Sequence, residues 1–136
     1  MKIIIVDKKA DIPDQKHDLD KLKEDFQKRG HYVDGPYKKL IEGDDLTVES
    51  YNPIVDLGDY QVAVAHPRFI KDEYGLADLF LLAEEVKRRP KFRVIFYSGQ
   101  PDFKKKIGLR QSSQVYYLSS GADTFDRIID LVENGW

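Results

Sequence analysis

The sequence predicts an α/β fold in which helices cover a parallel β-sheet. Four short runs are apolar at every position, at residues 3–6, 62–65, 94–97 and 115–118. Continuous apolar runs of this length are typical of strands that are buried on both faces, as in parallel sheets. Segments with helical spacing of apolar residues separate the runs, and such alternation is typical of the α/β class.

The remaining elements are predicted from weaker signals. A fifth strand is expected at residues 31–33, and helices are expected between Pro13 and Gly30, around residues 76–86 and around residues 125–132. Proline early in a helix and glycine just after its end are the usual end signals. Residues 34–58 are rich in glycine and proline, and we expect an altered second helix there, with a broken helix through residues 47–57. Residues 100–113 have apolar residues for one short helix.

Composition limits the function classes. The chain has 136 residues, of which 41% are hydrophobic, which is enough for one core and one domain. It has no cysteine, so disulfides, thiol nucleophiles and thiolate metal sites are excluded, and this fits the cytoplasm. No stretch has the ~20 apolar residues that a membrane helix needs. The net charge of −2 gives no general attraction to nucleic acid or membrane.

The charge is distributed unevenly. Residues 87–110 contain nine basic residues and one acidic residue, a net charge of +8, whereas the rest of the chain carries −10. A basic run of this kind is either a solvated face or a recognition surface, and the solvated face is the commoner case.

Polar residues follow the predicted strands. Asp7-Lys8, His66-Pro67, Ser98-Gly99 and Ser119-Ser120 come directly after the four clear apolar runs. Ligands of open α/β sheets bind beyond the carboxyl ends of the strands, so these residues are expected to converge there. The loop after the first strand has no glycine, and the chain has no phosphate-binding loop or nucleophile-elbow motif.

The order of these features resembles the receiver domain of bacterial response regulators. The matching segments are KIIIVD (2–7), GHYV (30–33), DYQVAVAH (59–66), GL (75–76), VIFYS (94–98) and YLSS (117–120), and the resemblance covers nearly the whole chain. It implies a flavodoxin-like, five-stranded parallel sheet in the order 2-1-3-4-5 with helices on both faces. The chain would be a single receiver-like domain over residues 1–136, with an atypical second-helix region at residues 34–58.

Carried over position by position, the resemblance implies a degenerate phosphorylation pocket. Active receivers hold Mg²⁺ with two acids after the first strand and accept the phosphoryl group on an Asp after the third. Asp7 matches the first acid, but Lys8 replaces the second and His66 stands at the phosphoacceptor position. Ser98 keeps the hydroxyl expected after the fourth strand, whereas Ser120 replaces the Lys expected after the fifth.

The degenerate pocket predicts that phosphotransfer is lost. Mg²⁺ needs hard oxygen ligands, and an ammonium beside the remaining carboxylate repels it, although Lys8 could instead pair with Asp7. Without the metal, charge on a transferring phosphoryl group lacks its main stabilisation. We therefore expect a non-phosphorylatable pseudo-receiver that needs no cofactor or metal. It would not be an enzyme but a regulatory protein–protein interaction module in cytoplasmic two-component signal transduction.

The resemblance also implies a face for the partner, which would be another protein, an effector domain or a second copy of the chain. In receivers this face is made by the fourth helix, fifth strand and fifth helix. Here it would include aromatic and basic residues of the kinds that anchor interfaces, namely Phe103, Lys104, Lys105, Lys106, Arg110, Tyr116 and Arg127.

Two other functions remain open on the sequence alone. A small hydrolase or phosphate-handling enzyme would use Asp7, His66 and Ser98, with His66 as a base that titrates near neutral pH. Nucleic-acid binding through the +8 segment ranks lower, because no aromatic residues for base stacking are interleaved with the bases and the chain as a whole is acidic.

Overall fold

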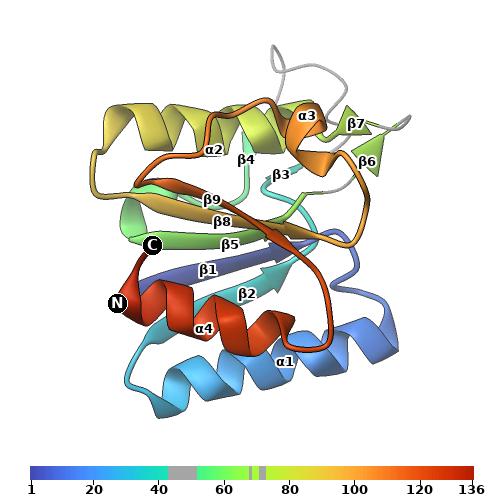
Figure 1. Cartoon of the computed structure of the whole chain (residues 1–136), viewed down its shortest axis with the longest axis vertical. Coiled ribbons are helices and arrows are strands. Elements are labelled where there is room, and N and C mark those ends of the chain that lie inside the picture. The colour runs from blue at the N-terminus through green and yellow to red at the C-terminus, as the bar shows by residue number, and fades with distance from the viewer. Residues whose placement is uncertain (43–51, 68, 71–72) are drawn as a thin grey trace.

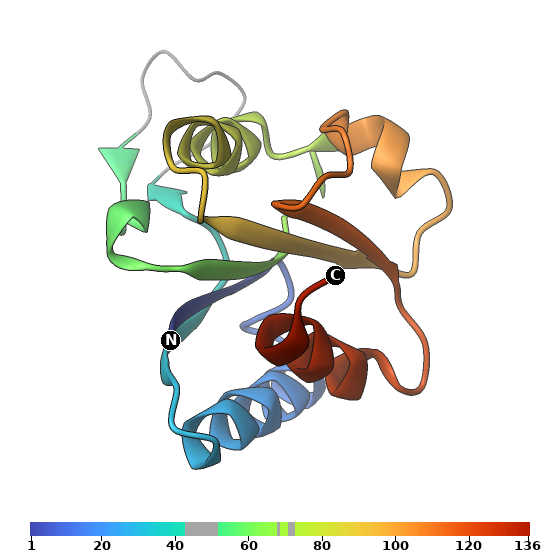
Figure 2. The ribbon, with the colours of Figure 1, turned by 60° about the vertical axis from the view of Figure 1, so that its left-hand side comes forward.

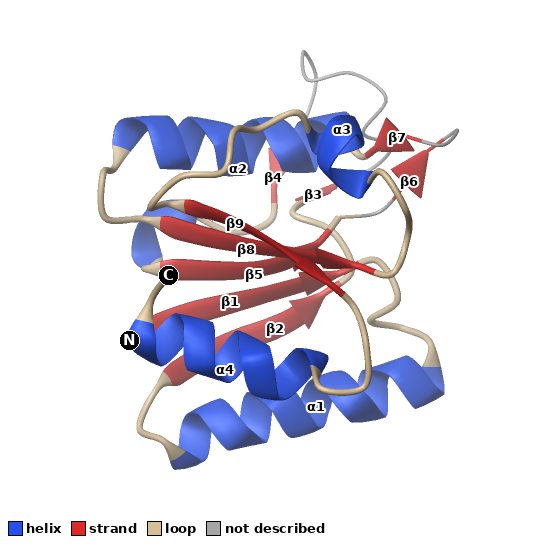
Figure 3. Cartoon of the chain, in the orientation of Figure 1, coloured by secondary structure: helices blue, strands red, loops and turns tan. Residues whose placement is uncertain are grey.

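A computed structural model describes residues 1–42, 52–67, 69–70 and 73–136, and its centre is a five-stranded parallel sheet. The strands lie in the spatial order β2-β1-β5-β8-β9, and every neighbouring pair is parallel (Figures 1 and 3). Their bounds are β1 Lys2–Asp7, β2 Tyr32–Tyr37, β5 Val62–His66, β8 Arg93–Ser98 and β9 Val115–Ser119. Numbered along the chain, the five strands follow the order 2-1-3-4-5, so the predicted flavodoxin-like α/β arrangement is confirmed.

Helices cover both faces of the sheet, as Figure 2 shows in a view near the sheet edge. Helices α1 (Pro13–Lys28) and α4 (Thr124–Asn134) pack side by side on one face. Helix α2 (Leu76–Arg88) and the short α3 (Phe103–Ile107) cover the other. In the part of the chain that the structure describes, no helix is long and apolar enough to cross a membrane.

The apolar runs form the sheet because successive side chains of a strand point to opposite faces, and here both faces are covered. In β1, Ile3 and Ile5 pack with α1 and α4, whereas Ile4 and Val6 pack with α2 and α3. The same alternation holds in β8, where Ile95 packs with α1 and α4 and Phe96 packs with α2 and α3. All of these side chains are fully buried, which explains why the runs carry no alternation of polar and apolar residues.

The predicted second-helix region has a different structure. Between β2 and β5 the described residues form the antiparallel pair β3 (Ile41–Glu42) and β4 (Asn52–Pro53), followed by a 3₁₀ turn, η1 (Leu57–Asp59). The broken helix expected through residues 47–57 is therefore wrong for residues 52–57, and residues 47–51 lie outside the described residues. Pro53 explains part of this outcome, because it disfavours helical backbone at the residue before it.

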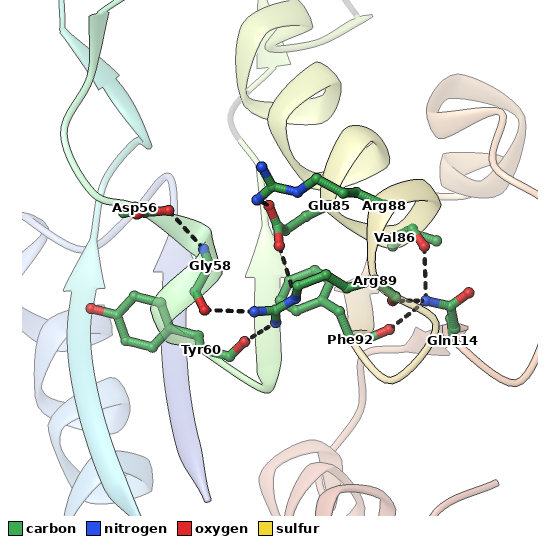
Figure 4. A network of polar contacts seen from close by, with 9 residues as sticks. All are labelled: Asp56, Gly58, Tyr60, Glu85, Val86, Arg88, Arg89, Phe92 and Gln114. Carbon is green, nitrogen blue, oxygen red and sulfur yellow. Dashed lines mark hydrogen bonds and ion pairs between the residues drawn. The ribbon is translucent and has the colours of Figure 1, made fainter.

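Arg89 fixes the carboxyl end of α2 to the turn η1. Its Nη1 donates to the Gly58 carbonyl oxygen at 2.6 Å, its Nη2 donates to the Tyr60 carbonyl, and its Nε lies 2.9 Å from Glu85 Oε2 (Figure 4). The planar guanidinium serves all three acceptors at once, which an ammonium cannot do with the same geometry.

Gln114 closes the same end of α2. Its Nε2 has two hydrogens and lies 2.9, 2.7 and 2.8 Å from the carbonyl oxygens of Val86, Arg89 and Phe92, so one N–H is shared between two of them (Figure 4). The Val86 carbonyl lies in the last turn of α2 and has no partner within the helix, so the amide before β9 supplies one and also ties the helix end to the turn that leads into β8.

Candidate functional site

The candidate site lies at the carboxyl ends of β1, β5 and β8. Asp7 and His66 are direct register partners on the adjacent strands β1 and β5. The chain changes direction between these two strands, because β2 lies on one side of β1 and the later strands lie on the other. Such a switch point is where ligands of open α/β sheets bind. Tyr97 of β8 completes the cluster, since its ring centroid is 5.3 Å from that of His66 in an edge-to-face contact.

The Asp7 carboxylate is buried and held by the protein itself. Its Oδ1 accepts a hydrogen bond from the Lys9 backbone N–H at 2.8 Å, and its Oδ2 accepts one from the Tyr97 hydroxyl. Only 7% of Asp7 is exposed, so each of these bonds replaces water that the carboxylate has lost. Burial and the negative charge of Asp7 raise the pKa of Tyr97 well above its ordinary value, which keeps the phenol a donor.

His66 stands beside this pair with an unused nitrogen. Its Nδ1 is buried and has no hydrogen-bond partner among the described residues. Burial lowers the pKa of His66, and the nearby charge of Asp7 only partly opposes this effect. A lowered pKa favours the neutral ring, in which one nitrogen accepts and the other donates.

Lys8 does not pair with Asp7. Its Nζ lies over the Phe69 ring, 4.3 Å from the centroid, and Lys106 Nζ lies 5.0 Å from the same centroid. Burial and the neighbouring charge of Lys9 lower the pKa of Lys8, while Asp7 raises it. The expectation that Lys8 could neutralise Asp7 directly is wrong, because Phe69 and the Tyr97–Asp7 bond hold the two side chains in separate contacts.

Ser98 belongs to the other side of the sheet. It follows Tyr97 on β8, and Phe96, two residues earlier, packs in the α2/α3 layer. Its Oγ accepts from the Gln100 backbone N–H at 3.1 Å. Strand parity therefore separates the Ser98 hydroxyl from Asp7 and His66, although all three follow predicted strand ends. Ser120 is exposed and directly follows β9. Its backbone N–H donates to the Ser98 carbonyl oxygen at 3.0 Å.

A cavity of about 640 Å³ opens beside Asp7, His66 and Tyr97, between α1 and α4. Its volume is within the ~300–1,000 Å³ typical of small-molecule sites. Among the residues that the structure describes, no three histidines or carboxylates are grouped closely enough to hold a metal ion.

The predicted interaction face surrounds the edge strand β9. Lys104, Lys105 and Arg110 are exposed at α3 and after it, and Arg127 is exposed on α4. Tyr116 is half-buried against Trp136, with ring centroids 5.5 Å apart.

Two side chains of this face are held inside the fold. Phe103 is 4% exposed and packs edge-to-face on Tyr117, so the prediction that Phe103 contributes to an exposed surface is wrong. Lys106 is half-buried at Phe69. The exposed part of the face is thus basic rather than aromatic.

Tyr97 is the site residue that sequence reasoning missed. It ends an apolar run and was predicted only as part of a strand. A usable signal was present, because a tyrosine at the last position of a buried apolar run needs a partner for its hydroxyl. Comparisons of the chain with protein-family models, with curated proteins and with solved structures find no match.

Proposed function

We propose that this chain is a receiver-like signalling domain that does not accept phosphoryl groups and acts by contact with another protein. One observation carries the proposal: both oxygens of Asp7, the sole carboxylate left at the pocket positions of the receiver pattern, are hydrogen-bonded inside the protein. Mg²⁺ would have to displace the Tyr97 hydroxyl from a buried carboxylate and would meet no second acid beside it.

The residue at the phosphoacceptor position supports the same function. His66 has no carboxylate oxygen to accept a phosphoryl group, and its Nδ1 is buried while its ring packs against both Tyr97 and Phe69. An enzyme that uses Asp7, His66 and Ser98 together is disfavoured, because strand parity directs the Ser98 side chain to the opposite layer.

The exposed basic residues around β9 support a protein contact at that edge. Lys104, Lys105 and Arg110 have no ion-pair partner among the described residues, so their charges are available to an acidic partner surface. Charge complementarity of this kind mainly raises the association rate and selects partners.

Loss of phosphotransfer is tested with acetyl phosphate and with beryllium fluoride, each with Mg²⁺. Intact-mass measurement should show no phosphorylated species, and amide chemical shifts at Asp7, His66 and Ser98 should not respond to beryllium fluoride. Saturable, Mg²⁺-dependent binding of beryllium fluoride would contradict the proposal.

The contact is tested with the double variant Lys104→Glu/Lys105→Glu. A protein captured by the immobilised chain should be lost with this variant and retained with Lys87→Glu/Lys91→Glu. The control reverses the same charge within the same basic run, near the amino end of β8. Equal capture by all three forms would exclude this face.

A further inference from the structure

A groove of about 720 Å³ runs between α2 and the segment that joins β4 to η1. One wall is the side of α2 from Phe80 to Arg88, and the other wall is the segment Pro53–Leu57. Helix α2 and η1 are in contact, and Figure 2 shows the green β4–η1 segment beside the helix, which is seen nearly end-on. The exposed lysines of α3 do not line this groove, so it is a surface separate from the proposed contact at β9.

The lining of the groove is apolar and open to solvent. Ile54 is 42% exposed and Phe80 is 38% exposed, and Val55 and Leu81 are half-buried beside them. Leu76, one helical turn before Phe80 on α2, is also exposed and extends the apolar surface. Exposed apolar side chains that gather at one place are typical of an interaction surface.

Each wall also carries one exposed carboxylate. Asp56 lies before η1, where its Oδ1 accepts from the Gly58 backbone N–H at 2.8 Å, and Glu84 lies on α2. Neither carboxylate forms an ion pair with a described residue. The other two charges of the lining, Glu85 and Arg88, are paired with each other. The groove is therefore negative on both walls, and its charge complements an occupant with basic groups on two sides.

The β4 wall does not suit an added β-strand. Pro53 has no N–H, and the Ile54 N–H already donates to the Leu40 carbonyl oxygen at 2.8 Å. A strand that docks by its backbone needs free donors and acceptors along the edge that it joins. An α-helix satisfies its own backbone hydrogen bonds and can bind through side chains alone.

The length of the groove also fits a helix. From Phe80 to Arg88 the axis of α2 rises ~12 Å, at 1.5 Å per residue. Apolar residues at positions i, i+4 and i+7 of a docked helix span roughly 10 Å, so the groove accommodates about two helical turns.

We propose that this groove binds an amphipathic helix of a protein partner, with an apolar face of two turns and lysine or arginine on both flanks. The apolar face would lie against Ile54, Phe80 and Leu81, and the basic flanks would lie at Asp56 and Glu84. The two carboxylates would repel an acidic helix, and they would repel an anionic membrane surface in the same way.

The test uses a synthetic helical peptide of leucine and lysine, about 14 residues or roughly four turns long, with the leucines on one face. It is titrated into the full chain, and backbone amide shifts are followed. The amides of Val55 and Leu81 should shift saturably, whereas those of Gly30 and Lys104, which lie outside the groove, should not. No saturable shift at Val55 and Leu81 would overturn the proposal.

Two control peptides separate docking of a basic helix from general adsorption. The first has glutamate in place of every lysine, and the second keeps the lysines but has a proline at its centre, which breaks the helix. Neither should shift the amides of Val55 and Leu81 saturably. Equal shifts from the acidic peptide or from the proline peptide would overturn the proposal.

The apolar contact is tested with Ile54→Ala. This variant should weaken binding of the leucine–lysine peptide about three- to ten-fold, because it removes part of the apolar area that the helix covers. Ile12→Ala is the matched control, since Ile12 is similarly exposed but lies before α1 and outside the groove. Unchanged binding in Ile54→Ala, or an equal loss in Ile12→Ala, would contradict docking in the groove.

The charge contacts are tested with Asp56→Asn and Glu84→Gln, each of which should weaken binding about two- to five-fold. Asparagine at position 56 keeps an oxygen that can accept from Gly58, so the start of η1 is retained. Asp59→Asn is the control, because it removes an exposed charge of η1 that does not line the groove. Unaltered affinity in both groove variants, or an equal loss in the control, would overturn the proposal. All of these positions lie outside the Asp7 pocket and α3, so the result is independent of the proposed receiver-like function.

Discussion

The Tyr97 hydroxyl donates a hydrogen bond to the buried Asp7 carboxylate, and the two residues are 90 positions apart in the chain. We expect Tyr97→Phe to lower the free energy of unfolding by about 1–3 kcal/mol, because a buried carboxylate oxygen would lose its donor. Urea denaturation at pH 7 measures the change. Tyr32→Phe is the control, since Tyr32 is 58% exposed and should change stability by less than about 0.5 kcal/mol. Equal effects of the two substitutions would contradict the role of the Tyr97–Asp7 bond.

Gly35 is expected to tolerate no side chain, unlike Gly30. Both have positive φ, +105° and +88°, but a Cβ at Gly35 would lie 2.4 Å from the Ile5 carbonyl oxygen, whereas a Cβ at Gly30 meets open space. Gly30→Ala should therefore cost only the backbone strain of about 1–2 kcal/mol. Gly35→Ala should cost about 4 kcal/mol or more, because the β1–β2 backbones must move apart. Thermal unfolding followed by circular dichroism separates the two, and similar melting temperatures would refute this prediction.

Gln114→Glu tests the closure of α2 with a nearly isosteric change. The amide donates to three carbonyl oxygens, and a carboxylate at the same place would repel all three. We expect a loss of about 3 kcal/mol in urea denaturation at pH 7, partly recovered at pH 4 where the new carboxyl is protonated. Gln100→Glu, at an exposed position, should have little effect. A Gln114→Glu protein as stable as this control would show that the three bonds contribute nothing.

Stability should fall in alkaline solution partly because of Tyr117. Burial raises the pKa of Tyr117 to about 12 in the folded protein, whereas an unfolded tyrosine titrates near 10. Between these values the unfolded chain binds fewer protons than the folded one, so stability decreases as pH rises, by up to about 1.4 kcal/mol per pH unit from this group.

Tyr117→Phe isolates that contribution. The variant loses the hydrogen bond to the Leu109 carbonyl and should be less stable at pH 8, but its stability should decrease less steeply between pH 10 and pH 11.5. The two curves of unfolding free energy against pH are thus expected to approach each other. Parallel curves would mean that Tyr117 does not titrate with the raised pKa.

The sheet was predictable from sequence because its strands are buried on both faces and leave continuous apolar runs. Strand β2 was predicted only as residues 31–33, yet it extends over Tyr32–Tyr37. Its second half contains Gly35 and Pro36, and both residue types are depleted in strands. Strand β2 tolerates them because it lies at the edge of the sheet, where its outer side forms no hydrogen bonds to a neighbouring strand.

The site was predictable in position but not in orientation. Counting residues after each apolar run correctly placed Asp7 and His66 together, because parallel strands end at one edge. It could not assign a face, since one residue of displacement along β8 exchanges Tyr97 for Ser98. The burial of Phe103 was also missed. The five-residue helix α3 has three lysines beside only two apolar residues, so its sequence indicates an exposed charged surface rather than a packed one.

The parity of β8 also separates the Asp7 pocket from the proposed protein contact. The cavity beside Asp7 and the exposed lysines of α3 have no lining residue in common, and the sheet separates them. Tyr97 faces the cavity layer, and Ser98, joined to it by a single peptide unit, faces the layer of α3. The end of β8 therefore contributes side chains to both layers, so a displacement of this backbone would move Tyr97 beside Asp7 and Ser98 in the α3 layer together.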